Sequence, residues 1–165
     1  MGNSKQNVAV LVVSCDNYSD AWKPFFDFFY KYWNDCPYPV YLTSNNKKYE
    51  DSRVQTIQTM KTSTWSDELK TALEKIEQEY IILLLEDYFI YEPVNTADVE
   101  NLVGIVHNLN AGFMRIYCFP SKFNYLYSYS PIEKYSGIGL TDVDATYRIT
   151  TQAGIWNKET LISLL

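Results

Sequence analysis

The fold expected for this chain is decided by the stretch Tyr80-Ile81-Ile82-Leu83-Leu84-Leu85-Glu86-Asp87-Tyr88. Its first six residues are apolar apart from one hydroxyl, a pattern typical of a strand that is buried on both faces. Such strands lie mostly in the middle of a parallel sheet covered by helices. Ligands of open α/β sheets bind at the carboxyl ends of the strands. The two carboxylates that end this stretch are therefore the first candidate site.

Glu86 and Asp87 predict a partner of positive charge. Two neighbouring carboxylates repel each other unless a cation joins them. A divalent cation such as Mg²⁺ or Mn²⁺ that also binds a phosphate group meets this need with oxygen ligands. The alternative for the pair is a turn or a helix cap without chemistry.

The rest of the chain predicts an α/β domain around this strand. The apolar run Val8 to Val13 is expected to be the first strand, also buried on both faces. Further strands are expected at 40–43, 54–57 and 113–119, with a short one within 147–155. Helices are expected at 20–33, at 98–110, after a cap at Thr64 or Ser66, and after a cap at Asn157. This order of elements is typical of a single domain with a mostly parallel sheet flanked by helices.

The helix expected at 20–33 carries its large aromatic residues on one face. They recur at the spacing i, i+3, i+4, which indicates core packing, and no ligand role is expected for them: Trp22, Phe25, Phe26, Phe29 and Trp33. Pro24 is tolerated only in the first turn of a helix, so this helix is expected to begin close to it.

Composition and charge exclude several classes of function. The 165 residues are 47% hydrophobic and 21% charged, as in ordinary globular domains. The net charge of −6 argues against non-specific nucleic-acid binding, which needs a basic face. Three cysteines without a C-x-x-C pair predict neither a zinc site nor a disulfide framework, and favour the cytoplasm. No stretch approaches the roughly 20 apolar residues that span a bilayer, although contact with the inner face of a membrane is an option.

Several familiar chemistries are also absent from the sequence. His107 is the one histidine, and it falls within an expected helix, which disfavours hydrolases that need a well-placed imidazole. Neither a dinucleotide-binding G-x-G-x-x-G nor a phosphate-binding G-x-x-x-x-G-K-[ST] is present. The remaining candidates for a functional site are the acidic and hydroxyl groups at the strand ends.

Two strand ends carry such groups. Ser14, Asp16 and Tyr18 follow the first strand, and Glu86 and Asp87 follow the central one. If both strands belong to one parallel sheet, these clusters face one crevice. A metal at one end would hold a diphosphate, and the loop at the other would hold a nucleoside. That division suits a nucleotide-sugar donor, whose leaving diphosphate the metal would neutralise.

Four segments then carry a resemblance to a known family: Val13-Ser14-Cys15-Asp16-Asn17-Tyr18, Trp65-Ser66-x-x-Leu69, Leu83 to Phe89, and Gln152-Ala153-Gly154-Ile155-Trp156. In this order they resemble bacterial GT-A-fold glycosyltransferases of lipopolysaccharide and capsule assembly. The resemblance extends from Val8 to Leu165. It implies a GT-A-like, Rossmann-like fold. It also implies transfer of a sugar from a nucleotide-sugar donor, such as a UDP-sugar, to a saccharide or glycolipid acceptor.

The same resemblance implies roles for individual residues. Asp87 would hold the divalent metal, with Glu86 beside it. Gln152 and Trp156 would lie near the transferred sugar or the acceptor. The nucleotide side would be formed by Ser14, Asp16, Tyr18, Trp65, Ser66 and Lys70.

The chain departs from the family pattern in two respects. The usual Asp-x-Asp is replaced by Glu86-Asp87-Tyr88, so one metal ligand is missing or substituted. The relatives also continue beyond the Gln-Ala-Gly-Ile-Trp segment, so the acceptor portion and the catalytic base are expected downstream. Within this chain Asp142 and Asp144 are the candidate bases, and a solvated turn is their alternative. The alternative for the whole chain is a non-catalytic module that binds a nucleotide or a sugar.

Overall fold

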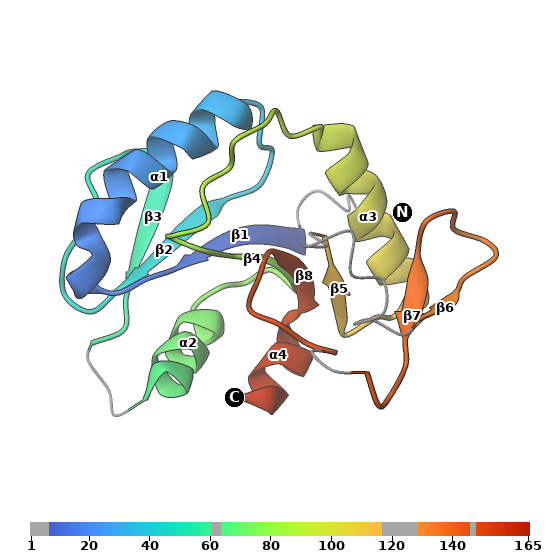
Figure 1. Cartoon of the computed structure of the whole chain (residues 1–165). Coiled ribbons are helices and arrows are strands. Elements are labelled where there is room, and N and C mark those ends of the chain that lie inside the picture. The colour runs from blue at the N-terminus through green and yellow to red at the C-terminus, as the bar shows by residue number, and fades with distance from the viewer. Residues whose placement is uncertain (1–6, 61–63, 117–128, 146–147) are drawn as a thin grey trace.

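The computed structural model describes residues 7–60, 64–116, 129–145 and 148–165. A six-stranded sheet forms its centre (Figure 1). Its strands are β1 (Val8–Val13), β2 (Val40–Ser44), β3 (Val54–Gln58), β4 (Tyr80–Leu85), β5 (Phe113–Arg115) and β8 (Gly154–Asn157). Their order across the sheet is β3-β2-β1-β4-β8-β5. The first four strands are parallel, whereas β8 runs antiparallel to both of its neighbours.

Helices cover both faces of this sheet, which gives three layers (Figure 1). The helices are α1 (Ser19–Tyr32), α2 (Trp65–Glu74), α3 (Thr96–Leu109) and α4 (Lys158–Leu164). Helices α1 and α3 pack on one face, and α2 and α4 pack on the other. A 3-10 turn, η2 (Asp16–Tyr18), joins β1 to α1, and the strands β6 (Tyr129–Pro131) and β7 (Gly139–Thr141) form a separate hairpin. The predicted α/β domain with a mostly parallel sheet is confirmed.

The two central strands are buried on both faces, as their sequences predicted. All six residues of β1 are buried, as are the first five of β4. Alternate side chains enter different cores, because successive residues of a strand point to opposite faces. Val10 packs toward α1 and α3, whereas Leu11 packs toward α2 and α4. A continuous apolar run is therefore what a strand between two helical layers requires.

Helix α1 has nearly the bounds expected for it, but Pro24 lies deeper inside the helix than expected. The helix starts at Ser19, so Pro24 lies inside it, just beyond the first turn. Proline there removes one backbone hydrogen bond. The buried aromatic face of the helix offsets that loss, since each large ring contributes about 1.5–3 kcal/mol on full burial: Trp22, Phe25, Phe26 and Phe29.

The last part of the chain differs most from expectation. The strand expected within 147–155 is β8, which begins at Gly154 and is antiparallel. A side chain at Gly154 would meet the Phe113 ring at 2.4 Å, so the close pairing with β5 requires glycine. The hairpin of β6 and β7 lies in a stretch expected to be irregular. The part of the expected strand at 117–119, and the tyrosines of 120–128, lie outside the described residues.

The chain order creates a switch point between β1 and β4. From β1 the chain moves outward through β2 and β3, and it then returns to add β4 on the other side of β1. The last residues of the two strands, Val13 and Leu85, are paired. Crevices at such switch points are the usual ligand sites of open α/β sheets. Among the described residues, no helix is both long enough and apolar enough to cross a membrane.

Candidate functional site

The polar ends of β1 and β4 lie side by side at this switch point. Ser14 directly follows Val13, and Glu86 directly follows Leu85. The Ser14 backbone N–H donates to the Thr43 hydroxyl (2.8 Å), which in turn donates to the Ser14 carbonyl oxygen (2.7 Å). This pair of bonds fixes Ser14 against the end of β2. The expectation that the two polar clusters share one edge of the sheet is confirmed.

The Ser14 hydroxyl connects three parts of the molecule. Its oxygen accepts a hydrogen bond from the indole Nε1 of Trp22, at 2.8 Å. The same hydroxyl lies beside the Glu86 carboxylate and offsets part of the rise in pKa that burial causes there. Since Trp22 is buried beneath α1, the hydroxyl ties the helix, the first strand end and the carboxylate of the second strand end together.

Asp16 is bound by the backbone of the neighbouring loop. Its carboxylate accepts hydrogen bonds from the backbone N–H groups of Asn45 (3.0 Å), Asn46 (3.1 Å) and Lys47 (3.1 Å). Partial burial acts to raise its pKa, but these three donors and the charge of Lys47 outweigh that effect, and the pKa is lowered. The ionised carboxylate of Asp16 therefore holds the β2–β3 loop to the β1 loop.

Glu86 has the opposite electrostatic character. Burial raises the pKa of its carboxyl group, and the negative charge of Asp87 raises it further. The Ser14 hydroxyl and the backbone N–H of Glu86 itself offset part of this. Asp87 is exposed beside it. This pair is thus short of positive partners within the described part of the chain, and it would gain from a cation or from a proton.

The start of α2 lies at the same edge of the sheet as the two strand ends. Thr64 caps the helix by accepting the backbone N–H of Asp67, at 3.1 Å, as one of the two expected caps. The Asn45 side chain donates to the Glu68 carboxylate at 3.0 Å, which joins α2 to the loop that binds Asp16. Trp65 and Ser66 begin α2 at this edge, and Lys70 follows further along the helix, with an exposed side chain.

The remaining expected residues of the nucleotide-sugar site are not all brought together. Tyr18 ends η2 at the same edge, with an exposed ring. Gln152 precedes β8, and the pairing of Gly154 with Leu83 brings it level with the end of β4. Trp156 is 3% exposed and stacks on Phe113 with ring centroids 4.2 Å apart, so it is a core residue of the α2 and α4 face. Its placement gives no support to a role beside the sugar.

Asp142 and Asp144 also lie away from the switch point. They belong to the turn after β7, where the backbone N–H of Ala145 donates to the Asp142 carbonyl oxygen (3.1 Å). Figure 1 shows the hairpin of β6 and β7 on the far side of the molecule from η2 and the start of α1. The structure therefore does not bring these two carboxylates to the proposed crevice, and the solvated turn describes them better.

Glu86 and Asp87 supply too few ligands to form a complete metal site without a substrate. Within the described ranges, no group of three or more histidine, cysteine, aspartate or glutamate side chains could hold an ion. Glu86 and Asp87 supply two carboxylates. Mg²⁺ is commonly bound by one or two carboxylates, with substrate phosphates and water completing its shell. The residues thus suit a cation that arrives with a phosphate, and not a preformed metal cage.

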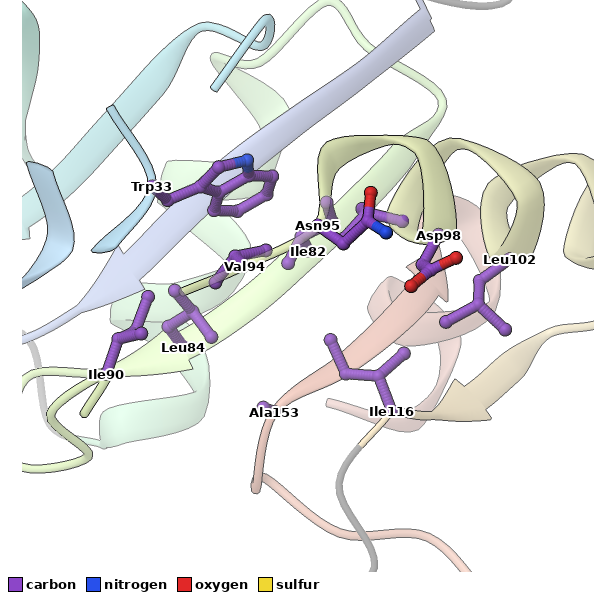
Figure 2. Close-up of a pocket in the computed structure, with 11 residues that line it drawn as sticks. Trp33, Ile82, Leu84, Ile90, Val94, Asn95, Asp98, Leu102, Ile116 and Ala153 are labelled. Carbon is purple, nitrogen blue, oxygen red and sulfur yellow. The ribbon is translucent and has the colours of Figure 1, made fainter. Parts of the chain in front are cut away.

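A cavity of about 280 Å³ lies against the segment that follows β4, which contributes Ile90 and Val94 to its lining. Figure 2 shows it between the first turns of α3 and the sheet, with Asn95 and Asp98 as the polar groups of its lining. The other lining residues are Trp33, Ile82, Leu84, Ile90, Val94, Val99, Leu102, Ile116 and Ala153. A lining of this kind suits an apolar group and cannot neutralise a diphosphate.

Several residues that shape the site were not predicted from the sequence. Thr43 and Trp22 were expected only in a strand and a helix core, and Asn45 was given no role, yet each binds a residue of the β1 loop. The Ser44-Asn45-Asn46-Lys47 turn was the available signal, since successive backbone N–H groups in a turn form an anion-binding concavity.

Comparison with known proteins does not assign a family. No protein-family model and no curated protein matches the chain. Among solved structures, the chain is similar to the crystal structure of the Aq1419 protein from Aquifex aeolicus VF5. The two are 14% identical over 99% of this chain and 76% of that chain, with a TM-score of 0.48. A likeness of this degree carries no conclusion about function.

Proposed function

We propose that this chain is a glycosyltransferase that binds a nucleotide-sugar donor at the β1–β4 switch point and transfers the sugar to a saccharide or glycolipid acceptor. The observation that carries the proposal is the pairing of Val13 with Leu85, which places the polar ends of two adjacent parallel strands side by side. The resemblance to GT-A enzymes of bacterial lipopolysaccharide and capsule assembly rests on residues at this same edge. Such enzymes act in the cytoplasm, on the inner face of the membrane.

The nucleoside would lie over the β1 loop and the start of α2. Tyr18 and Trp65 both present exposed rings there, and aromatic rings stack well on bases. The ammonium groups of Lys47, in the β2–β3 loop, and Lys70, in α2, would counter the charge of the phosphates. Lys47 is already oriented, since it donates to the Ser19 hydroxyl at 2.6 Å.

The diphosphate would lie next to Glu86 and Asp87. A divalent metal bound by Asp87 would neutralise the charge that develops on the leaving diphosphate. The protein groups do the orienting: Ser14 fixes the Glu86 carboxylate, and Asp16 keeps the β2–β3 loop closed against the site. The glycosidic bond to the diphosphate would break as a hydroxyl of the acceptor forms a new bond to the sugar, with the bonding electrons leaving on the nucleoside diphosphate and the hydroxyl proton passing to a base.

A thermal-shift screen tests donor binding. UDP, GDP, CDP and dTDP, with and without Mn²⁺, should include one nucleotide that raises the melting temperature of the wild type. The Asp87→Ala variant should lose this shift. Asp27→Ala removes an exposed carboxylate of α1 that pairs with Lys23, and this control should keep it. Absence of a shift with every nucleotide would exclude the proposal.

Catalysis is separated from binding by the fate of the sugar. With the nucleotide identified, its sugar conjugates are incubated with the protein and the release of nucleoside diphosphate is followed. Release that depends on Asp87 supports a transferase. A nucleotide-dependent shift without release, in the presence of saccharide acceptors, would instead favour the non-catalytic binding module.

A further inference from the structure

A row of aromatic rings lies on the outside of α1, where the core does not require them. Phe28 stacks on Tyr32 with centroids 6.1 Å apart and planes inclined by 20°. Phe28 also contacts Phe89, of the segment after β4, at 5.7 Å. Phe28 and Phe89 are 39% and 42% exposed. We call these three residues the aromatic strip.

The rings of the strip are fixed in position without being covered. Phe89 rests on the buried Phe25, with centroids 6.3 Å apart. The Lys31 ammonium lies 5.7 Å from the Phe28 centroid and 4.8 Å from that of Tyr32. Rings held in this way lose little conformational freedom when a ligand covers them, which favours binding.

The strip starts at the candidate site. Phe89 follows Asp87 by two residues. The segment then runs beside the end of α1, since the backbone N–H of Val94 donates to the Tyr32 carbonyl oxygen at 2.8 Å. Figure 1 shows this connection passing from the end of β4 along α1 to α3. A ligand on the strip would therefore extend from the acidic pair along the seam between the segment and α1.

We propose that the aromatic strip binds the acceptor saccharide. This inference rests on the proposed function, because it names the second substrate of that site. The C–H faces of pyranose rings pack on flat aromatic rings, and their hydroxyl groups need polar partners at the edge. Lys31 provides a charged donor beside the rings, and the exposed Asp87 and Glu92 lie within three residues of Phe89 in the sequence.

Charge distinguishes a saccharide from the other occupant that such a surface could take, an anionic membrane. Attachment to an anionic leaflet needs a cluster of basic residues. Here Asp87 and Glu92 flank Phe89 in the sequence, and the net charge of the whole chain is −6. A ligand of neutral hydroxyl groups matches this surface better than phospholipid headgroups do.

Saturation-transfer NMR tests the proposal with the full chain and a panel of free sugars. The probes are methyl glucosides, galactosides and mannosides, with the corresponding disaccharides. Wild-type protein should transfer saturation to pyranose C–H protons of at least one probe. Phe28→Leu keeps an apolar side chain that suits a helix but removes the ring, and should weaken this binding roughly fivefold. Leu140→Ala removes an exposed apolar side chain from the hairpin and should leave binding unchanged.

Three results would overturn the inference. They are no transfer to any probe, equal binding by wild type and Phe28→Leu, and co-sedimentation with phosphatidylglycerol vesicles that Phe28→Leu loses while no sugar binds. The nucleotide shift of the same preparations separates this inference from the proposed function. A shift present in Phe28→Leu together with unchanged sugar binding refutes the strip alone. A shift absent from the wild type refutes the donor site.

Discussion

Two adjacent strand ends carry carboxylates that differ in their hydrogen-bond partners and in the direction of their pKa shifts. Asp16, beyond β1, is bound by three backbone N–H groups, and its pKa is lowered. Glu86, beyond β4, is partly buried next to Asp87, and its pKa is raised. The first carboxylate is already satisfied by the fold. Among the described residues the fold gives Glu86 no positive partner, and this is why Glu86 and Asp87 are proposed as the pair that meets an external ligand.

The largest contrast is expected in turnover. If the acidic pair carries the chemistry, Asp87→Asn should lower donor turnover at least about 100-fold, as loss of a group that stabilises transition-state charge does. Asp16→Asn should change turnover only a few-fold, through the loop it holds. Steady-state kinetics of nucleoside diphosphate release measures both. Equal losses in the two variants would abolish the distinction between the two strand ends.

For stability, the larger effect is expected from Asp16 and the smaller one from Asp87. Asp16→Ala removes the acceptor of three backbone donors and should lower the free energy of unfolding by about 2 kcal/mol. Asp87→Ala touches an exposed side chain and should change it far less. Urea unfolding at neutral pH compares them. A fully stable Asp16→Ala protein would show that the β1 loop does not depend on this carboxylate.

Ser14 connects the two ends, and its substitution sharpens the comparison. Ser14→Ala leaves the buried indole N–H of Trp22 without its acceptor, which should cost about 1 kcal/mol. The pKa of Glu86 should rise further, because the hydrogen bond that lowers it is lost. Urea unfolding and an NMR titration of the Glu86 carboxyl carbon measure the two effects. Ser14→Cys keeps a weak acceptor for the indole, so its free energy of unfolding should lie between those of wild type and Ser14→Ala.

The smallest effect is the dependence of stability on pH. The lowered pKa of Asp16 contributes stability above its unfolded value near 3.8, and this is lost as the pH falls through the folded pKa. The raised pKa of Glu86 acts in the opposite sense: stability is greatest below the unfolded value near 4.5 and is lost as the pH rises through the folded pKa. Glu86→Gln should therefore be slightly more stable than wild type at pH 7, and equal to it near pH 4.

A reversed sign would contradict the assignment. If Glu86→Gln is less stable than wild type at neutral pH, the ionised carboxylate is favoured in the fold, and the pair has a positive partner of its own. Asp16→Asn provides the matched control, since it should lose stability at pH 7 and match wild type in acid. Unfolding curves at pH 7 and pH 4 suffice for Glu86→Gln, whereas the acid curve of Asp16→Asn must be recorded below the folded pKa of Asp16.

The sequence predicted the elements that repeat a simple pattern. The apolar runs at 8–13 and 80–85 gave the two central strands with their bounds, because burial on both faces allows no polar residue. The aromatic spacing gave α1, and Thr64 and Asn157 cap the helices that they were expected to cap. The shared edge of the two polar clusters followed from the parallel sheet alone.

Other features depend on contacts distant in the sequence. The direction of β8 is set by pairing with β4 and β5, and nothing in its four residues specifies it. The role of Asp16 depends on a loop about 30 residues away, which the local sequence does not reveal. Trp156 was assigned to the sugar by resemblance, whereas its contact with Phe113 makes it a core residue. The metal and the catalysis stay predictions.

The indole of Trp22 gives the protein an optical reporter of its own. Its N–H is bonded to the hydroxyl that also contacts Glu86, while the ring itself is sealed from solvent. An event that changes the charge of Glu86 or draws Ser14 away reaches the chromophore through a single oxygen atom. Ultraviolet emission, recorded in a Trp65→Phe background so that the exposed indole of α2 does not contribute, should therefore register binding at the switch point, and replacing Trp22 by phenylalanine should weaken that signal.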